Sequence, residues 1–155
     1  MATQFEIREF AASDLEAAYQ LDQSCFEPGI SFTRGQIRDF VRRSGAISLV
    51  IDRPDNPDEL VALAIGQVSG SRAHVITIDI AASARRGGLG KRLFEELLAR
   101  FAAAGARTVR LEVDVRNAPA RRFYERMGFE ETRKLPDYYG DGIDGIRMVR
   151  ELGGK

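Results

Sequence analysis

The spacing of apolar positions divides this chain into short segments of two kinds. Stretches with alternating apolar residues or clustered β-branched residues predict strands, and apolar residues three or four positions apart predict helices. By these criteria strands are expected at residues 5–10, 47–51, 59–69, 74–80, 108–115, 130–135 and 143–151, and helices at 13–25, 33–44, 93–101 and 117–128. This order implies an α/β fold, a mixed sheet with helices on its faces. The last two helices should each cross over between parallel strands.

The composition suits a single domain, residues 1–155. Hydrophobic residues make up 44% of the 155 positions, which is enough for a sizeable core at this length. The 23 basic and 23 acidic side chains cancel, so bulk charge gives no reason to expect a nucleic acid or an anionic membrane as a partner. The tail at 152–155 is expected to be loose.

Cysteine usage and hydropathy favour a cytoplasmic protein. The single cysteine excludes an intrachain disulfide and fits a reducing compartment. No apolar run approaches the length of a membrane span, and the N-terminus lacks the charged start and apolar core of a signal peptide. With one histidine, one cysteine and no close histidine–carboxylate spacing, no metal is expected.

A glycine-rich turn at residues 79–91 joins an expected strand to an expected helix. Gly87, Gly88 and Gly90 have no Cβ, so the backbone there can approach a ligand closely. The first N–H groups of the helix have no intrahelical partner and lie at the positive end of its dipole. Basic side chains flank the glycines: Arg85, Arg86, Lys91 and Arg92. These features predict an anion site, most naturally for phosphate.

Two common phosphate-loop patterns do not fit this turn. The P-loop pattern requires Ser or Thr after Gly-Lys, and this chain has Arg92 there. The dinucleotide pattern requires a third glycine where Leu93 stands. The pattern that fits is Arg-x-x-Gly-x-Gly, formed by Arg85, Gly88 and Gly90. A flexible turn before a helix would also explain these glycines, so the context outside the turn has to decide.

Two stretches together resemble the GCN5-related N-acetyltransferase (GNAT) family. The turn at residues 85–90 resembles the family's acetyl-CoA pyrophosphate loop. Residues 111–129 resemble its block Leu-Glu-Val…Asn…Ala…Phe-Tyr…Gly-Phe. The resemblance implies the GNAT fold, a mixed, mostly antiparallel sheet of about seven strands with four helices on its faces. It also implies acetyl-CoA as the co-substrate.

The same resemblance implies binding roles for particular residues. In this family the backbone of the strand before the loop holds the pantetheine arm, which here means Ile78, Asp79 and Ile80. Residues of the turn would hold the pyrophosphate: Arg85, Arg86, Gly87, Gly88, Leu89, Gly90 and Lys91. Asn117 is a further expected contact of CoA, although capping its helix would by itself explain an asparagine there.

Two side chains are predicted to carry the chemistry. An amine that attacks a thioester must be neutral, and the departing thiolate must be stabilised or protonated. Glu112 shares one strand face with Arg110 and Asp114, and this pattern alone favours a solvated face with ordinary charges. The resemblance to the family reverses this preference and implies that Glu112 is a general base acting through water. The phenol of Tyr124 is predicted to protonate the CoA sulfur or to donate a hydrogen bond to it. The alternative is a core aromatic beside Phe123.

Within the family, the protein N-terminal acetyltransferases, including the RimI-like ribosomal-protein alanine group, are the most similar. Residues 25–28 resemble the loop that lines their substrate groove, and residues 138–148 resemble their last hairpin. Phe26, Pro28 and Tyr138 are therefore expected to shape the amine site. One departure is that no Trp follows Pro28, which leaves the peptide substrate open.

The expected reaction is acetyl transfer from acetyl-CoA to a primary amine, by direct attack in a ternary complex. The resemblance favours a protein or peptide N-terminus, with ribosomal proteins among the candidates. An α-amine has a pKa of about 7.7–8.0 against about 10.4 for lysine, so it would need only modest help from a base. One alternative is a small-molecule amine or a lysine side chain. Another is a silent acyl-CoA-binding module. Monomer and homodimer both stay open. His74 is expected to be a satisfied strand histidine, and Cys25 a small buried hydrophobe.

Overall fold

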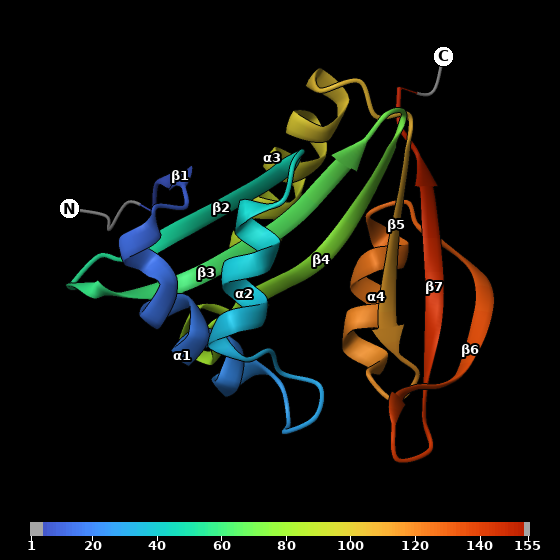
Figure 1. Ribbon diagram of the computed structural model, residues 1–155, viewed down its shortest axis with the longest axis horizontal. Helices are drawn as coiled ribbons and strands as arrows, with labels where there is room; N and C mark the ends of the chain where they lie inside the picture. The colour runs from blue at the N-terminus through green and yellow to red at the C-terminus, as the bar shows by residue number, and fades with distance from the viewer. Residues whose placement is uncertain (1–4, 154–155) are drawn as a thin grey trace.

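The computed structural model describes residues 5–153, which form one seven-stranded sheet with helices on both faces. The strand order is β1-β2-β3-β4-β5-β7-β6. Helices α1 and α2 lie in front of the sheet and α3 and α4 behind it (Figure 1). The strands are β1 (Ile7–Glu9), β2 (Ala46–Arg53), β3 (Asn56–Ser69), β4 (Arg72–Ile80), β5 (Thr108–Asp114), β6 (Glu130–Gly140) and β7 (Ile143–Glu151). The helices are α1 (Leu15–Cys25), α2 (Arg34–Arg42), α3 (Leu89–Ala103) and α4 (Ala118–Arg126), with 3-10 turns η1 (Ala12–Asp14) and η2 (Ala82–Ala84).

The sheet opens in its middle. Every neighbouring pair of strands is antiparallel except β4 and β5, which run parallel and pair only from Arg72 to His74. Beyond His74 the two strands diverge (Figure 1), while β4 stays paired to β3 as far as Ile80. The backbone of β4 from Val75 onward therefore has no strand partner on its β5 side.

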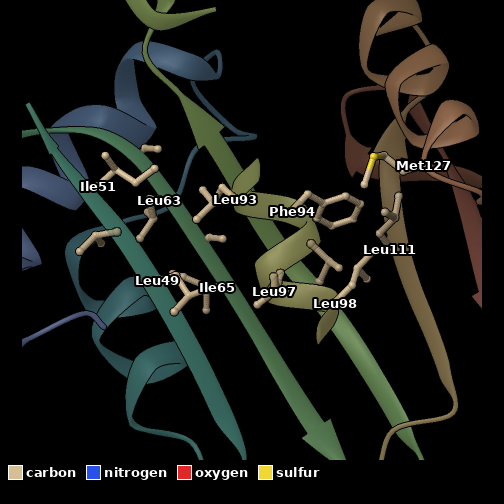
Figure 2. Close-up of a cluster of buried hydrophobic side chains, with 14 of the residues drawn as sticks. Leu49, Ile51, Leu63, Ile65, Leu93, Phe94, Leu97, Leu98, Leu111 and Met127 are labelled. Atoms are coloured by element: carbon tan, nitrogen blue, oxygen red, sulfur yellow. The ribbon is translucent and has the colours of Figure 1, made fainter. Parts of the chain in front are cut away.

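Helix α3 and its aromatic neighbours join the two halves of the opened sheet. Buried side chains of α3 share one cluster with β2 and β3 on one side and with β5 and the end of α4 on the other (Figure 2). Phe94 is fully buried, and its ring centroid lies 5.8 Å from Phe123, 5.7 Å from Tyr124 and 5.6 Å from Phe129. Burial of these large rings holds α4 beside α3 where backbone pairing is absent.

Gly66 marks the closest approach of the sheet to α3. A Cβ built at Gly66 would overlap the ring of Phe101, which is itself fully buried. We expect Gly66→Ala to lower the free energy of unfolding by about 1–3 kcal/mol, because an overpacked core must shift its side chains. Urea denaturation measures this change. Gly35→Ala on α2 is the matched control, since its Cβ would meet nothing closer than 3.9 Å, and no loss of stability is expected there.

The sequence analysis placed all the main elements and missed several of their ends. The polar connection expected at 52–58 is a two-residue turn at Pro54 and Asp55, because β2 and β3 go on pairing as far as Arg53 and Asn56. Strand β6 likewise continues through residues 136–140, with a register shift before Gly140. These strand ends are solvated, so backbone pairing continues where the hydrophobic pattern stops.

Both helix crossovers join parallel strands, as expected. The α3 crossover leads from β4 to its neighbour β5. The α4 crossover leads from β5 to β6, which run parallel because both are antiparallel to β7, the strand between them. The expected loose tail is tied down at its start, since the Leu152 N–H donates to the Arg107 carbonyl at 2.7 Å. Residues 154 and 155 lie outside the described residues. None of the helices within 5–153 combines the length and the hydropathy that a bilayer-spanning helix needs.

Candidate active site

A cleft of about 770 Å³ occupies the opening between β4 and β5. Its walls are the free edge of β4, the turn before α3, residues 111–114 of β5, the inner side of α4 and the loop between α1 and α2. The cleft therefore lies where two strands lack a backbone partner, and its apolar walls come from both halves of the sheet.

The turn that opens α3 lines the cleft and is the predicted anion site, called the anion cradle below. Gly88 is the N-cap of α3 with φ +77°, a conformation that favours glycine, and no side chain caps this helix. The first helical hydrogen bond runs from the Arg92 N–H to the Gly88 carbonyl, so the N–H groups of residues 89–91 have no helical acceptor. The space around a Gly88 Cβ is open. This geometry fits a phosphate group, as the sequence predicted.

Most of the residues that were predicted to bind the cofactor line the cleft. The cleft is lined by Arg85, Arg86, Gly88, Gly90, Lys91, Ile78 and Ile80. Gly87 and Leu89 are not among its lining residues, and Leu89 is buried in the core. The side chain of Asp79 points into the protein and is 1% exposed. Arg85 is anchored, since its Nε donates to the Ile80 carbonyl at 2.9 Å.

Glu112 lies in the middle of the cleft wall and is heavily ion-paired. Its side chain is 6% exposed, so it is not part of a solvated face. His74 Nε2 donates to Oε1 at 2.6 Å, and Arg147 Nε donates to Oε2 at 3.0 Å. Arg110 Nε lies 3.5 Å from Oε2. Burial alone would raise the pKa of Glu112, but the His74 hydrogen bond and the two arginines outweigh it and lower this pKa. The group is therefore a fixed carboxylate at neutral pH.

Tyr124 lines the cleft from α4 and packs against Phe94. Phe123 is equally half-buried and also lines the cleft, so the two neighbours do not divide into one core ring and one exposed ring. Burial, and then the negative charge of Asp79, raise the pKa of Tyr124. The phenol therefore keeps its proton through neutral and mildly alkaline pH, as a hydrogen-bond donor must.

Aromatic and aliphatic side chains from the loop after α1 and from β6 also line the cleft. Phe26, Ile30 and Phe32 reach it from the loop after α1, and Tyr139 reaches it from β6. Of the three residues predicted for the amine site, only Phe26 lines the cleft. Pro28 is exposed on the loop, and Tyr138 is 47% exposed and packs edge-on against Tyr139. The neighbouring tyrosine therefore occupies the position that the sequence analysis gave to Tyr138.

Arg116 connects the two sides of the cleft mouth. Its guanidinium bonds Asp114 at the end of β5 at 2.6 Å and Glu27 in the loop after α1 at 2.8 Å. These three side chains are charged groups at the rim, and the Arg116–Glu27 pair is exposed, so its contribution to stability is small.

Three other predicted residues have clear local roles. Asn117 caps α4 by accepting a hydrogen bond from the Ala120 N–H at 3.2 Å, and it also lines the cleft. His74 is satisfied, as expected, but its partner is Glu112. Cys25 is half-buried in the cleft wall, where burial first raises the pKa of its thiol.

Comparison with known proteins identifies the family. Residues 15–129 match the Acetyltransferase (GNAT) family. An uncharacterised N-acetyltransferase of Methanocaldococcus jannaschii is 30% identical over 146 residues, which cover 94% of this chain and 90% of the relative. The ribosomal protein bS18-alanine N-acetyltransferase of Escherichia coli strain K12 is 31% identical over 133 residues, 86% of each chain.

The fold agrees with these relatives. The crystal structure of the ribosomal-protein-S18-alanine N-acetyltransferase from Escherichia coli matches with a TM-score of 0.86 at 26% identity, covering 98% of this chain and 96% of that one. The family match, the split sheet and the anion cradle all agree with the resemblance found in the sequence. The chain therefore belongs to the GNAT acetyltransferase family and is an acetyl-CoA-dependent N-acetyltransferase.

Proposed function

We propose that the protein acetylates the α-amine of protein N-termini by direct attack on acetyl-CoA in a ternary complex. The observation that carries this proposal is the convergence of three features on one cleft: the anion cradle, the Glu112 carboxylate and the Tyr124 phenol. The relative from Escherichia coli, named for the alanine terminus of a ribosomal protein, supports a protein N-terminus as the substrate.

The residues at the cleft fit acetyl-CoA. The uncapped start of α3 and the positive φ of Gly88 suit a pyrophosphate, and Arg85, Arg86 and Lys91 supply cationic side chains beside it. The free backbone edge of β4 at residues 75–80 offers amide donors and acceptors to a pantetheine arm. When bound, acetyl-CoA would supply the activated acetyl group as a thioester.

The predicted roles of Glu112 and Tyr124 are refined by their surroundings. A carboxylate with a lowered pKa is a weak base, but an α-amine needs only modest help near neutral pH. Glu112 would hold a water molecule that accepts the amine proton. The raised pKa of Tyr124 makes full transfer of its proton to a thiolate uphill. Its phenol would therefore stabilise the sulfur mainly by donating a hydrogen bond from Oη.

Gly88→Asp is expected to weaken acetyl-CoA binding on the order of tenfold or more, which is about 1.4 kcal/mol or more of binding free energy. The new carboxylate would stand in the open space of the anion cradle and repel the phosphates. Isothermal titration calorimetry measures the Kd. The matched control is Gly70→Asp in the β3–β4 turn, where φ is +62° and the space for a Cβ is also open. Equal losses in both variants would place the anion site elsewhere.

The assay that tests the proposal follows free-thiol release from acetyl-CoA with a panel of amines. The panel holds short peptides beginning with Ala, Ser or Met, the same peptides with acetylated N-termini, spermidine and free lysine. Turnover on free N-termini that disappears on acetylation is the expected result. Turnover confined to spermidine or lysine would instead identify a small-amine or side-chain acetyltransferase. Tight acetyl-CoA binding without turnover of any amine would indicate a silent acyl-CoA-binding module.

A further inference from the structure

A pair of buried carboxyl groups lies beneath the cleft, where α1 meets β4. Asp22 is 0% exposed and Asp79 is 1% exposed. One oxygen of each is satisfied: Asp22 Oδ2 accepts from the Phe32 N–H at 2.7 Å, and Asp79 Oδ1 accepts from the Thr77 hydroxyl at 2.6 Å. The other two oxygens, Asp22 Oδ1 and Asp79 Oδ2, have no donor among the described residues. The two carboxyl groups are within hydrogen-bonding range of each other.

A single proton shared by the two carboxyl groups would give both unpartnered oxygens a hydrogen-bond partner. Two ionised carboxylates in contact and out of water would be strongly destabilising, because each lacks solvation and repels the other. One shared proton turns the two unpartnered oxygens into a donor and an acceptor and leaves one negative charge. Burial first, and then the neighbouring carboxyl of Asp22, hold the pKa of Asp79 well above its ordinary range.

The groups that face the pair do not neutralise it. They are Cys25 on α1, Thr77 on β4, Arg85 in the turn before α3 and Tyr124 on α4. Arg85 is the cation among them, and its charge lowers the pKa of Asp79, but burial and the Asp22 carboxyl outweigh it. The negative charge at Asp79 also raises the pKa values of the Cys25 thiol and the Tyr124 phenol.

The pair connects the two sides of the cleft. Asp22 accepts a hydrogen bond from the Phe32 N–H and so fixes the C-terminal end of the loop that also carries Phe26. Asp79 lies between Ile78 and Ile80, which line the cleft from the free edge of β4. We propose that Asp22 and Asp79 share one proton and act as a positioning pair, which fixes the loop at residues 26–32 against β4. In the proposed function, on which this role rests, the pair aligns the amine side of the cleft with the thioester side.

The first experiment tests the shared proton and does not depend on activity. Unfolding is measured in urea between about pH 5 and pH 8 for the wild type and for Asp22→Asn. The asparagine oxygen can accept from the Phe32 N–H, and its amide can donate to Asp79 without any titrating proton.

Above about pH 4 an unfolded aspartate has lost its proton, whereas the native pair keeps one, so wild-type stability should fall as pH rises. The unfolding constant of the wild type, divided by that of Asp22→Asn, should grow about tenfold per pH unit until the native pair also ionises. All groups outside the pair cancel in this ratio. Burial also favours a proton on Asp79 in Asp22→Asn, so the double variant Asp22→Asn/Asp79→Asn, in which neither position titrates, is measured as a second reference. A ratio to the double variant that stays flat across the series means that the pair holds no proton and overturns the proposal.

The second experiment tests positioning by steady-state kinetics with a peptide substrate. Asp22→Ala should raise the KM of the peptide about fivefold or more and change the KM of acetyl-CoA by less than about twofold. Asp22→Asn should recover most of the loss. A merely structural role would reduce the amount of folded enzyme, and hence the apparent kcat, with both KM values unchanged. That result overturns the positioning role.

The two experiments separate the possible failures. If Asp22→Ala does not fold, the comparison of the wild type with Asp22→Asn at rising pH still decides, since only the wild-type KM for the peptide should climb as its pair ionises. If the wild type turns over no amine at all, the proposed function fails and the positioning role fails with it. The unfolding series would still report whether the proton is shared.

Discussion

Tyr124→Phe is expected to lower kcat by about 10²–10³-fold and to leave the Kd for acetyl-CoA within about twofold. The substitution removes only the hydroxyl, while the ring keeps its contacts with Phe94 and Phe129. The lost hydrogen bond would act on the sulfur as it gains charge, so the effect should fall on turnover and not on binding. Single-turnover and steady-state assays at saturating acetyl-CoA measure it.

The pH dependence of the wild-type enzyme gives an independent check on Tyr124. Since burial and the Asp79 charge raise the pKa of the phenol, its ionisation should produce no fall in kcat below about pH 10. Tyr19→Phe is the matched control, because Tyr19 lies outside the cleft with the Arg34 guanidinium 3.9 Å from its ring centroid. If Tyr124→Phe turns over as fast as this control, the phenol has no role in the reaction.

Glu112→Gln should lower kcat/KM for a peptide amine by about 10²-fold near pH 7. The deficit should shrink above about pH 8, because an α-amine with a pKa of about 7.7–8.0 then loses its proton without a base. A deficit that stays constant with pH would show that Glu112 orients the substrate and does not accept its proton. The measurement is a pH series of kcat/KM with a peptide that has one amine.

The same substitution has a cost in stability that must be separated from the kinetic effect. The pKa of Glu112 is lowered in the fold, so the carboxylate stabilises the native state at neutral pH, and this contribution is lost as pH falls below about 4. Glutamine leaves Arg147 and Arg110 without a counter-charge and His74 without its carboxylate partner. Glu131→Gln, which removes an ion pair with Arg121 outside the cleft, is the control for charge loss alone.

The geometry of the turn before α3 depends on local signals in the sequence. A helix start without a capping side chain, a glycine at positive φ and nearby cations are all properties of adjacent residues, while the binding of an anion there stays a prediction. Asn117 as the cap of α4 was predictable for the same reason. The resemblance at residues 111–129 then provided the family, which a six-residue turn could not.

Contacts between distant residues account for what the sequence analysis missed. The bond between His74 and Glu112 depends on the register of β4 against β5, and the Asp22–Asp79 contact depends on how α1 lies on the sheet. Neither is visible in a hydrophobic pattern. The position of Tyr139, and not Tyr138, in the cleft wall has a related cause. Strand β6 shifts register between Leu135 and Gly140, so alternation along the chain does not tell which side chain faces the cleft.

The divergence of β4 from β5 also bears on edge-to-edge aggregation of the protein. A sheet edge with unpaired backbone groups invites strand addition and aggregation. The outer edges here are guarded, since β1 is only three residues long and β6 carries Glu130, Glu131, Arg133, Lys134 and Pro136. The long free edge of β4 is instead turned inward and walled by β5 and α4. A narrow ligand that carries amide groups can reach that edge. A strand that belongs to the sheet of another protein molecule cannot.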